Sequence, residues 1–255
     1  MLKIRIMPTL LYRDSTLVKG VAFDSWRRVG SLMQAVKVYN LRQVDELVFL
    51  DISATNQGRR PDFNLVDDFA DECFMPLTVG GGVRTVDDVR ELLRVGADKV
   101  AVNTVAVERP EVIREMAACF GSQCVVVSID VKKAGNGHET VWTHSGTCDT
   151  GLDPVAFALS VERMGAGEIL LTDIELDGTM TGYNRELIRK VASAVKIPVI
   201  ASGGAGSYQD MENVLSAGHA SAVAAASIFH FTEQTPIEAK MFLREAGFPM
   251  RICRE

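Results

Sequence analysis

The stretch ELVFLDI at residues 46–52 returns as EILLTDI at residues 168–174. The glycine-rich VGGGV of residues 79–83 returns as ASGGA of residues 201–205, and both shifts, from 46 to 168 and from 79 to 201, are 122 positions. Two independent matches at one offset indicate a duplicated half. Equivalent functional elements are therefore expected in both halves of the chain.

Short β-branched runs alternate with longer amphipathic segments along the whole chain, a pattern typical of βα units around a parallel sheet. The expected strands are residues 3–10, 46–52, 76–81, 99–104, 125–131, 168–174, 198–204 and 221–227. Eight strands with intervening helices in 255 residues predict an α/β fold, a (β/α)8 TIM barrel built from two duplicated half barrels. A doubly wound open sheet is the alternative, but it does not explain the duplication.

Helix boundaries fit the same layout. Thr85 is expected to cap the helix that follows the first glycine turn, and Gly96 to end it. Asn184 is the expected cap in the second half. No linker rich in glycine, serine or proline interrupts the chain, so residues 1–255 are expected to form a single domain.

The formal net charge of −6 disfavours a nucleic-acid partner, which would require a basic patch. The N-terminal apolar run is too short for a signal peptide, and no stretch reaches the length of a membrane span, so a cytoplasmic location without membrane contact is expected.

The cysteines are odd in number and form no CxxC pair, which predicts reduced thiols and no metal site: Cys73, Cys119, Cys124, Cys148 and Cys253. The histidines are dispersed without ligand spacing, and no cofactor is implied.

Both glycine turns follow a strand and precede a helix, where backbone N–H groups can approach an anion closely. One such turn is a weak signal, because tight turns use glycine for conformational reasons alone. One βα unit later, each half has small or polar residues at a strand end, Asn103 with Thr104 and Ala226 with Ser227. These ends share one face of a barrel, which predicts two phosphate sites for a phosphorylated small molecule with a phosphate at each end.

Four aspartates also lie at strand ends. A carboxylate in a partly dry barrel mouth can have a raised pKa and serve as a general acid or base. For Asp51 and Asp173 the favoured interpretation is structural, because acids at such junctions cap the following helix. Asp130, after the apolar run VVVSI, is the better candidate, and Asp177 is the fourth.

Charged residues occupy the opposite ends of the strands: Arg5, Glu46, Lys99 and Glu168. Charged residues at strand starts normally serve stability, which favours an ion-pair plug that closes the end of the barrel. A polar gate is the alternative, and the periodicity of the sequence does not distinguish the two. Lys19 belongs to a long loop expected over residues 14–30. Loops at that face commonly fold over substrate, although a solvated lysine is the simpler interpretation.

At the strand ends, FLDISAT, TVGGGV, ADKVAVNT, AGEILLTDIELDGTMTGY, PVIASGGAG and ASIFHF make the whole chain resemble the cyclase subunit of imidazole glycerol phosphate synthase. That family is a duplicated (β/α)8 barrel of histidine biosynthesis. It takes ammonia from a partner glutaminase and closes an imidazole ring on a bis-phosphorylated substrate, forming imidazole glycerol phosphate and AICAR.

Matched by position, the resemblance implies a substrate-binding set in two groups. One phosphate is bound by Gly82, Asn103 and Thr104, and the other by Asp177, Gly178, Gly204, Ala226 and Ser227. The resemblance adds Asp51, Thr172 and Ser202 to this set, with Lys19 closing over the substrate. It also makes Arg5, Glu46, Lys99 and Glu168 an ammonia gate and places Asp98 at the glutaminase interface.

One position departs from the family pattern. The family uses two aspartates as acid and base, at the ends of strands 1 and 5; Asp130 is present, but Leu11 occupies the first position. Leucine cannot ionise or form a hydrogen bond, and losing one member of a proton-transfer pair costs on the order of a hundredfold in rate. Asp14 is no obvious substitute, because the family pattern also carries an acid there.

The segment of residues 10–55 resembles a paralogous branch linked to acetamidino modification of surface sugars, such as those of lipopolysaccharide O-antigen. There, the cyclase-like and glutaminase-like subunits are thought to supply ammonia to a separate sugar amidotransferase. The complete set of gate residues fits that role, whereas the two phosphate sites are not explained by it. An authentic synthase is the alternative, and a sugar-phosphate isomerase of the same superfamily ranks last because it needs no gate.

Overall fold

The structure is a computed structural model that describes residues 3–135 and 137–251. Eight parallel strands are found in this part of the chain: β1 (Arg5–Arg13), β4 (Leu47–Asp51), β5 (Leu77–Gly80), β6 (Lys99–Val102), β7 (Val125–Lys133), β10 (Glu168–Asp173), β11 (Val199–Ser202) and β12 (Ala222–Ala225). Each pairs with the next, and β12 pairs with β1, so the sheet closes on itself. The predicted TIM barrel is confirmed.

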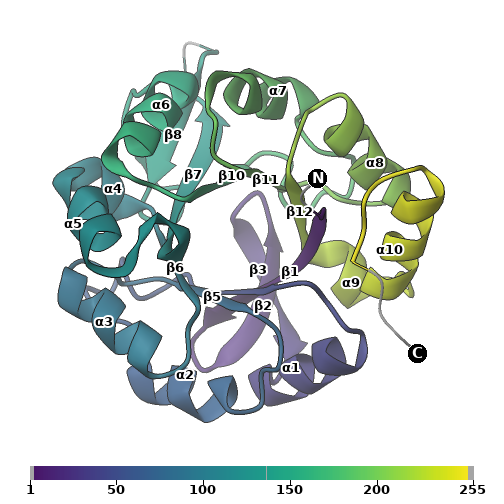
Figure 1. Cartoon of the computed structure of the whole chain (residues 1–255), viewed down its shortest axis with the longest axis horizontal. Coiled ribbons are helices and arrows are strands. Elements are labelled where there is room, and N and C mark those ends of the chain that lie inside the picture. The colour runs from purple at the N-terminus through teal and green to yellow at the C-terminus, as the bar shows by residue number, and fades with distance from the viewer. Residues whose placement is uncertain (1–2, 136, 252–255) are drawn as a thin grey trace.

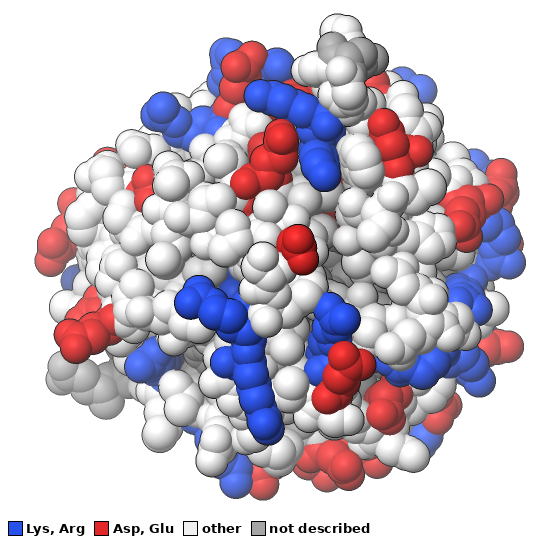
Figure 2. Space-filling model, turned by 180° about the vertical axis from the view of Figure 1, so that it is seen from behind, with Lys and Arg blue, Asp and Glu red and all other residues white. Residues whose placement is uncertain are grey.

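Helices surround the barrel on its outside (Figure 1). They are α1 (Leu32–Leu41), α2 (Phe63–Ala70), α3 (Val86–Arg94), α4 (Thr104–Glu108), α5 (Glu111–Phe120), α6 (Pro154–Met164), α7 (Arg185–Ala194), α8 (Tyr208–Ser216), α9 (Ser227–Phe231) and α10 (Pro236–Glu245), with a short 3-10 turn η1 (Ser122–Cys124). None of the helices in the described ranges is long and apolar enough to cross a membrane. Figure 2 shows the face of the molecule opposite to that in Figure 1, where acidic and basic side chains are interspersed on the surface.

The strands separate two apolar regions. On β1, Ile6 and Leu10 pack outward against the helices, whereas Met7 packs inward. The inward layer is completed by Val48, Ala101, Val126, Leu170, Ile200, Ala222 and Ala224. Because side chains alternate along a strand, Arg5, Thr9 and Leu11 face the barrel interior together with Met7. The interior therefore has a charged end, an apolar middle and an open mouth.

The backbone repeats the duplication seen in the sequence. Gly81 and Gly203 both have positive φ, 104° and 87°. A Cβ on Gly81 would lie 2.2 Å from the carbonyl oxygen of Asp51, and one on Gly203 would lie 2.6 Å from that of Asp173. Glycine is required at both positions, because a side chain would meet the neighbouring strand in each half.

Helix caps confirm the predicted boundaries. Thr85 caps α3 in a capping box, and its side chain accepts a hydrogen bond from the backbone N–H of Asp88. Ser207 caps α8 in the same way, 122 positions later. Asn184 caps α7 as predicted, by accepting a hydrogen bond from Leu187 N.

The loop expected over residues 14–30 is instead a β-hairpin of β2 (Thr16–Val21) and β3 (Asp24–Gly30). Strand β1 continues to Arg13, beyond the barrel, and its free edge pairs antiparallel with β2. At the hairpin turn, Ala22 and Phe23 both have positive φ, as two-residue hairpin turns require. Figure 1 shows the hairpin across the barrel opening.

A second hairpin extends β7 in the same manner. Strands β8 (Glu139–Thr143) and β9 (Cys148–Asp149) pair antiparallel beside the part of β7 that projects from the barrel. Asp130 was expected at a strand end, but β7 continues to Lys133. Asp130 instead pairs with Thr172 of β10 on one side and with Trp142 of β8 on the other.

Candidate functional site

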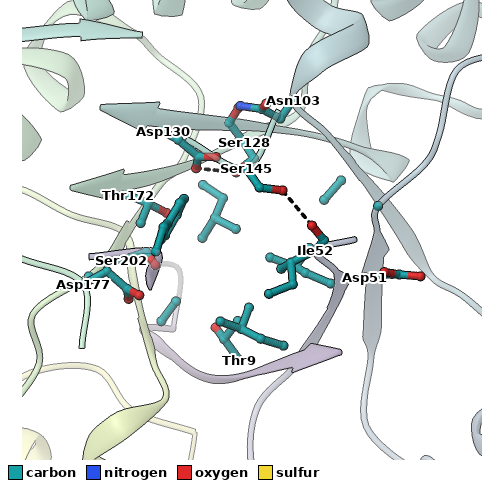
Figure 3. Close-up of a pocket in the computed structure, with 18 of the residues that line it drawn as sticks. Thr9, Asp51, Ile52, Asn103, Ser128, Asp130, Ser145, Thr172, Asp177 and Ser202 are labelled. Atoms are coloured by element: carbon teal, nitrogen blue, oxygen red, sulfur yellow. Dashed lines mark hydrogen bonds between the residues drawn. The ribbon is translucent and has the colours of Figure 1, made fainter. Parts of the chain in front are cut away.

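A cavity of about 230 Å³ lies at the carboxyl ends of the strands (Figure 3). Both halves of the chain contribute to it, as does the β2–β3 hairpin. It brings together every residue predicted for catalysis and substrate binding: Leu11, Lys19, Asp51, Gly82, Asn103, Thr104, Asp130, Thr172, Asp177, Gly178, Ser202, Gly204, Ala226 and Ser227. Active sites of TIM barrels form at this face, so the cavity is the candidate site.

Asp130 is a buried carboxyl group on the cavity wall. Burial raises its pKa to about 7, and the charge of Asp177 contributes in the same direction. A hydrogen bond of 3.2 Å donated by the Ser128 hydroxyl acts against this rise. A carboxyl group that titrates near neutral pH can both hold and release a proton, as a general acid or base must.

The β1 wall has no acid beside this group. Leu11 is buried, lines the cavity and pairs with Leu50 of β4 and Val18 of β2. Thr9 is the other inward residue of β1 at this level. The cavity therefore has an ionisable carboxyl on β7 and an apolar side chain where the family pattern has its partner.

Lys19 is 2% exposed and forms an ion pair with the carboxylate of Asp177. The backbone N–H of Ala22 donates to the carbonyl oxygen of Asp177 at 2.8 Å. A Cβ on Gly178 would lie only 2.1 Å from the carbonyl oxygen of Gly20, so the two backbones are in close contact. These contacts hold the hairpin over the mouth, and Lys19 is not a solvated side chain.

Two short helices begin at the cavity in equivalent ways. Asn103 precedes α4 with φ −122° and ψ −78°, and Ala226 precedes α9 with φ −130° and ψ −67°. Within residues 3–135 and 137–251, no side chain caps either helix. The first N–H groups of a helix need acceptors, and an anion can supply them. This matched pair supports the prediction of two phosphate sites.

In the first of these sites, the polar side chains already have partners. Asn103 Nδ2 donates to the carbonyl oxygens of Ser128 and Trp142, at 3.1 and 3.2 Å. Thr104 Oγ1 donates to Asn103 Oδ1 and accepts from His144 N. These bonds fix the backbone around the helix start, so an anion would be bound mainly by N–H groups.

In the second site, a side chain is left without a partner. The Ser227 hydroxyl is buried, and within the described ranges it has no hydrogen-bond partner. Gly204, which lines the same cavity, has φ 107°, and a Cβ there would lie 2.1 Å from the carbonyl oxygen of Gly182. A buried hydroxyl that can donate, next to uncapped N–H groups, fits a phosphate oxygen.

The carboxylate of Asp51 belongs to the turn after β4. Its Oδ1 accepts hydrogen bonds from Ser53 N and Ala54 N, at 2.9 and 3.0 Å. Figure 3 shows this carboxylate turned away from the middle of the cavity. Asp173, its counterpart in the second half, accepts from Leu176 N. Both carboxylates are structural, but neither caps a helix as predicted: they hold the local turn, while Asp62 caps α2 and Asn184 caps α7.

A closed ring of charges occupies the opposite end of the barrel interior. Arg5 lies 2.7 Å from Glu46 and 3.0 Å from Glu168. Lys99 lies 2.9 Å from Glu46 and 3.2 Å from Glu168. Each cation therefore contacts both anions. Burial alone would lower the pKa of Arg5, but the Glu168 and Glu46 carboxylates outweigh it, and the pKa is raised above its ordinary value.

Asp98 lies beside this ring, at the start of β6. It is exposed, and its carboxylate accepts a hydrogen bond from Leu77 N at 2.8 Å.

Residues 5–235 match the model of a family described as histidine biosynthesis protein. The chain belongs to that family. The match spans both halves, and so includes the ring and the cavity of this histidine biosynthesis barrel.

Sequence reasoning missed several residues that line the cavity of this family member. Thr9 and Ser128 could have been found, because each precedes an identified position by two residues and so shares its strand face. Phe23 and Trp26 come from the first hairpin, and His144 from the turn of the second, neither of which was predicted. Their positions depend on tertiary contacts rather than on a local pattern.

None of the cysteines among the described residues lines the cavity. Four thiols are free, those of Cys73, Cys119, Cys124 and Cys148, while Cys253 lies outside the described residues. Across residues 3–135 and 137–251, no group of three or more histidine, cysteine or acidic side chains could hold a metal ion.

Proposed function

We propose that the protein is the cyclase-like barrel subunit of a glutamine-dependent amidotransferase. It receives ammonia from a glutaminase subunit and conducts it toward acetamidino modification of a surface-polysaccharide sugar, with little or no cyclase activity of its own. The observation that carries the proposal is the combination of a complete charged ring with Leu11 on the wall beside Asp130. The charged ring is complete, whereas the acid/base pair lacks one carboxyl group.

The composition of the ring supports a gate over a plug. The Glu46 side chain is 2% exposed and contacts two cations, and the Thr78 hydroxyl donates to it at 2.6 Å. Burying such charges costs desolvation free energy, and apolar side chains of similar volume often serve stability equally well. An apolar layer around Met7 lies between the ring and the cavity. A polar ring followed by an apolar layer suits the transfer of a small neutral molecule such as ammonia better than that of an ion.

Exposed apolar side chains at the same end support a protein partner. Leu41 ends α1 and Phe74 precedes β5, and they are 81% and 83% exposed. Asn40 links their segments, because its side chain donates to Glu72 O and accepts from Phe74 N. Large exposed apolar groups are characteristic of interaction sites. Together with Asp98, they give the glutaminase a surface around the ring.

A second candidate function is the authentic cyclase subunit of imidazole glycerol phosphate synthase in histidine biosynthesis. Two observations favour it: the matched helix starts at Asn103 and Ala226, and a pKa of Asp130 near neutrality. A water or another group would then replace the missing carboxylate at Leu11. The two candidates differ in whether the barrel itself turns over the bis-phosphorylated substrate.

The proposal is tested by comparing ammonia sources in the complete assembly of barrel, glutaminase and sugar amidotransferase. Lys99→Met should abolish most glutamine-supported amidination while leaving the ammonium-supported rate unchanged, because free ammonium does not need the ring. Lys190→Met, which removes an exposed ion pair with Glu186 on α7, is the matched control. Normal glutamine-supported transfer by Lys99→Met would contradict the conduit role.

A further inference from the structure

The β1 wall of the cavity contains a polar group that none of the roles above uses. Thr9 lies two residues before Leu11 on the inward face of the strand, and it is 8% exposed. Thr9 is one of the residues that line the cavity, and its buried hydroxyl has no hydrogen-bond partner among residues 3–135 and 137–251. Figure 3 shows Thr9 across the cavity from Asp130.

A buried hydroxyl without a partner carries a desolvation penalty, and native structures contain few of them. Valine has nearly the same shape as threonine and would fill this position without that penalty. The neighbouring inward positions on β1 are apolar, Met7 below and Leu11 above. The missing partner of the Thr9 hydroxyl is therefore best explained as a group that enters the cavity.

Two further hydroxyls face the same space. Thr172 on β10 and Ser202 on β11 line the cavity, and neither side chain has a hydrogen bond within the described ranges. Figure 3 shows both beside Asp130 and Asp177. Hydroxyl groups can donate and accept, so this set suits neutral polar groups of a ligand. The apolar side chain of Leu11 disfavours a charged group next to Thr9.

We infer that Thr9 is a ligand-binding residue, whose hydroxyl forms a hydrogen bond with a neutral hydroxyl or amide group in the middle of a bis-phosphorylated small molecule. This rests on the two predicted phosphate sites of the cavity, which the second candidate function uses and the conduit role does not require. In this arrangement the helix starts at Asn103 and Ala226 bind the two phosphate groups of the ligand. Thr9 then favours ligands that have a neutral polar group between the phosphates.

Two probe ligands of equal length test this inference. Glucitol 1,6-bisphosphate carries hydroxyls between its phosphates, and hexane-1,6-diol bisphosphate does not. Binding is followed by the fluorescence of Trp26, which lines the cavity, in a Trp142→Phe background that removes the other tryptophan. Thr9→Val removes the hydroxyl at nearly constant shape, and Thr9→Ser keeps it.

Thr9→Val should weaken glucitol bisphosphate binding about fivefold, as expected for one neutral hydrogen bond. Thr9→Ser should bind it like the parent, and hexanediol bisphosphate should bind equally to all three proteins. Equal weakening of both ligands, or of neither, would overturn the role of Thr9 while leaving the phosphate sites in place. Absence of binding of both ligands to the parent would instead refute the cavity as a bisphosphate site, and the inference with it.

A second measurement separates the inference from a structural role. Without ligand, Thr9→Val should unfold at a temperature no lower than the parent, because it removes an unpaired buried hydroxyl. A clearly lower unfolding temperature would show that the hydroxyl has a partner within the protein, and would contradict the inference.

Discussion

Asp130 illustrates how burial of one residue sets a pH dependence. Its pKa is raised from an ordinary 3.8 to about 7, so between these values the folded protein holds a proton that the unfolded chain has lost. Stability should therefore fall as the pH rises from about 4 to about 7, and then level off. Asparagine resembles the protonated acid, so Asp130→Asn should be more stable than the parent at pH 8, by up to about 4 kcal/mol.

Chemical denaturation at pH 4.5 and pH 8 measures this effect. The gain from Asp130→Asn should be largest at pH 8 and reduced to about a quarter of that value at pH 4.5. Asp68→Asn, at an exposed position on α2, serves as the control and should show no such dependence. An equal effect of Asp130→Asn at both pH values would be inconsistent with a raised pKa.

At the same scale, the sequence reveals some site residues and not others. Asp130 follows an apolar run that marks a strand, so its place at the barrel mouth could be predicted. The burial of Lys19 could not be predicted, because its partner Asp177 is 158 positions away and only the closed barrel brings them together. The unpaired hydroxyl of Thr9 has no sequence signal beyond its strand face.

Among the elements, the β2–β3 hairpin is joined to the barrel by one buried ion pair, that of Lys19 with Asp177, in addition to its backbone contacts. Lys19→Met should leave the Asp177 carboxylate unpaired and weaken the hold of the hairpin on the mouth. Arg27 and Arg28 on β3 are exposed, so trypsin can report hairpin opening. Cleavage there should be at least about tenfold faster than in the parent, because local opening controls proteolysis.

Two comparisons make the hairpin prediction specific. Adding Asp177→Asn to Lys19→Met removes the unpaired charge and should restore part of the resistance to trypsin. Lys37→Met, which breaks an exposed pair with Glu72 on another part of the surface, should leave cleavage unchanged. Parental resistance of Lys19→Met would mean that the backbone contacts of Ala22 and Gly178 hold the hairpin without the ion pair.

The barrel strands were predictable as elements because buried parallel strands are continuous apolar runs. The two hairpins were not. Residues 16–30 mix charged and aromatic side chains, and most of β3 is exposed, so no clear period marks it as a strand. Both hairpins form where a barrel strand continues past its neighbours and offers a free edge, as β7 does up to Lys133. That edge is a property of the assembled sheet.

For the molecule as a whole, the charged ring joins strands of both halves at the end of the barrel. Glu46→Gln would leave Arg5 and Lys99 with Glu168 as their only anionic contact in the ring. Breaking a buried pair from one side should lower the free energy of unfolding by about 3 kcal/mol. Urea denaturation measures the difference, and Glu91→Gln, at an exposed pair with Arg94, is the control. Equal stability of Glu46→Gln and the parent would show that the ring contributes nothing to the barrel.

The architecture was the most predictable property, because the repeat offset of 122 positions constrains both halves at once. Asp51 and Asp173 keep the same turn, and Thr85 and Ser207 keep the same capping box. Function at this scale is less predictable. Family membership indicates a barrel with a cavity, but it does not specify which substrate binds in that cavity or which reaction occurs there. Only the chemistry of the complete site separates the two candidate functions.

The most direct test of the central claim is a cyclase assay on the purified barrel. Excess ammonium at alkaline pH replaces the glutaminase, and the substrate is the bis-phosphorylated compound that imidazole glycerol phosphate synthase uses. We expect the substrate to bind without forming imidazole glycerol phosphate above background, because Leu11 leaves Asp130 without its acid/base partner. Robust formation of imidazole glycerol phosphate would contradict the account and identify the protein as a working cyclase of histidine biosynthesis.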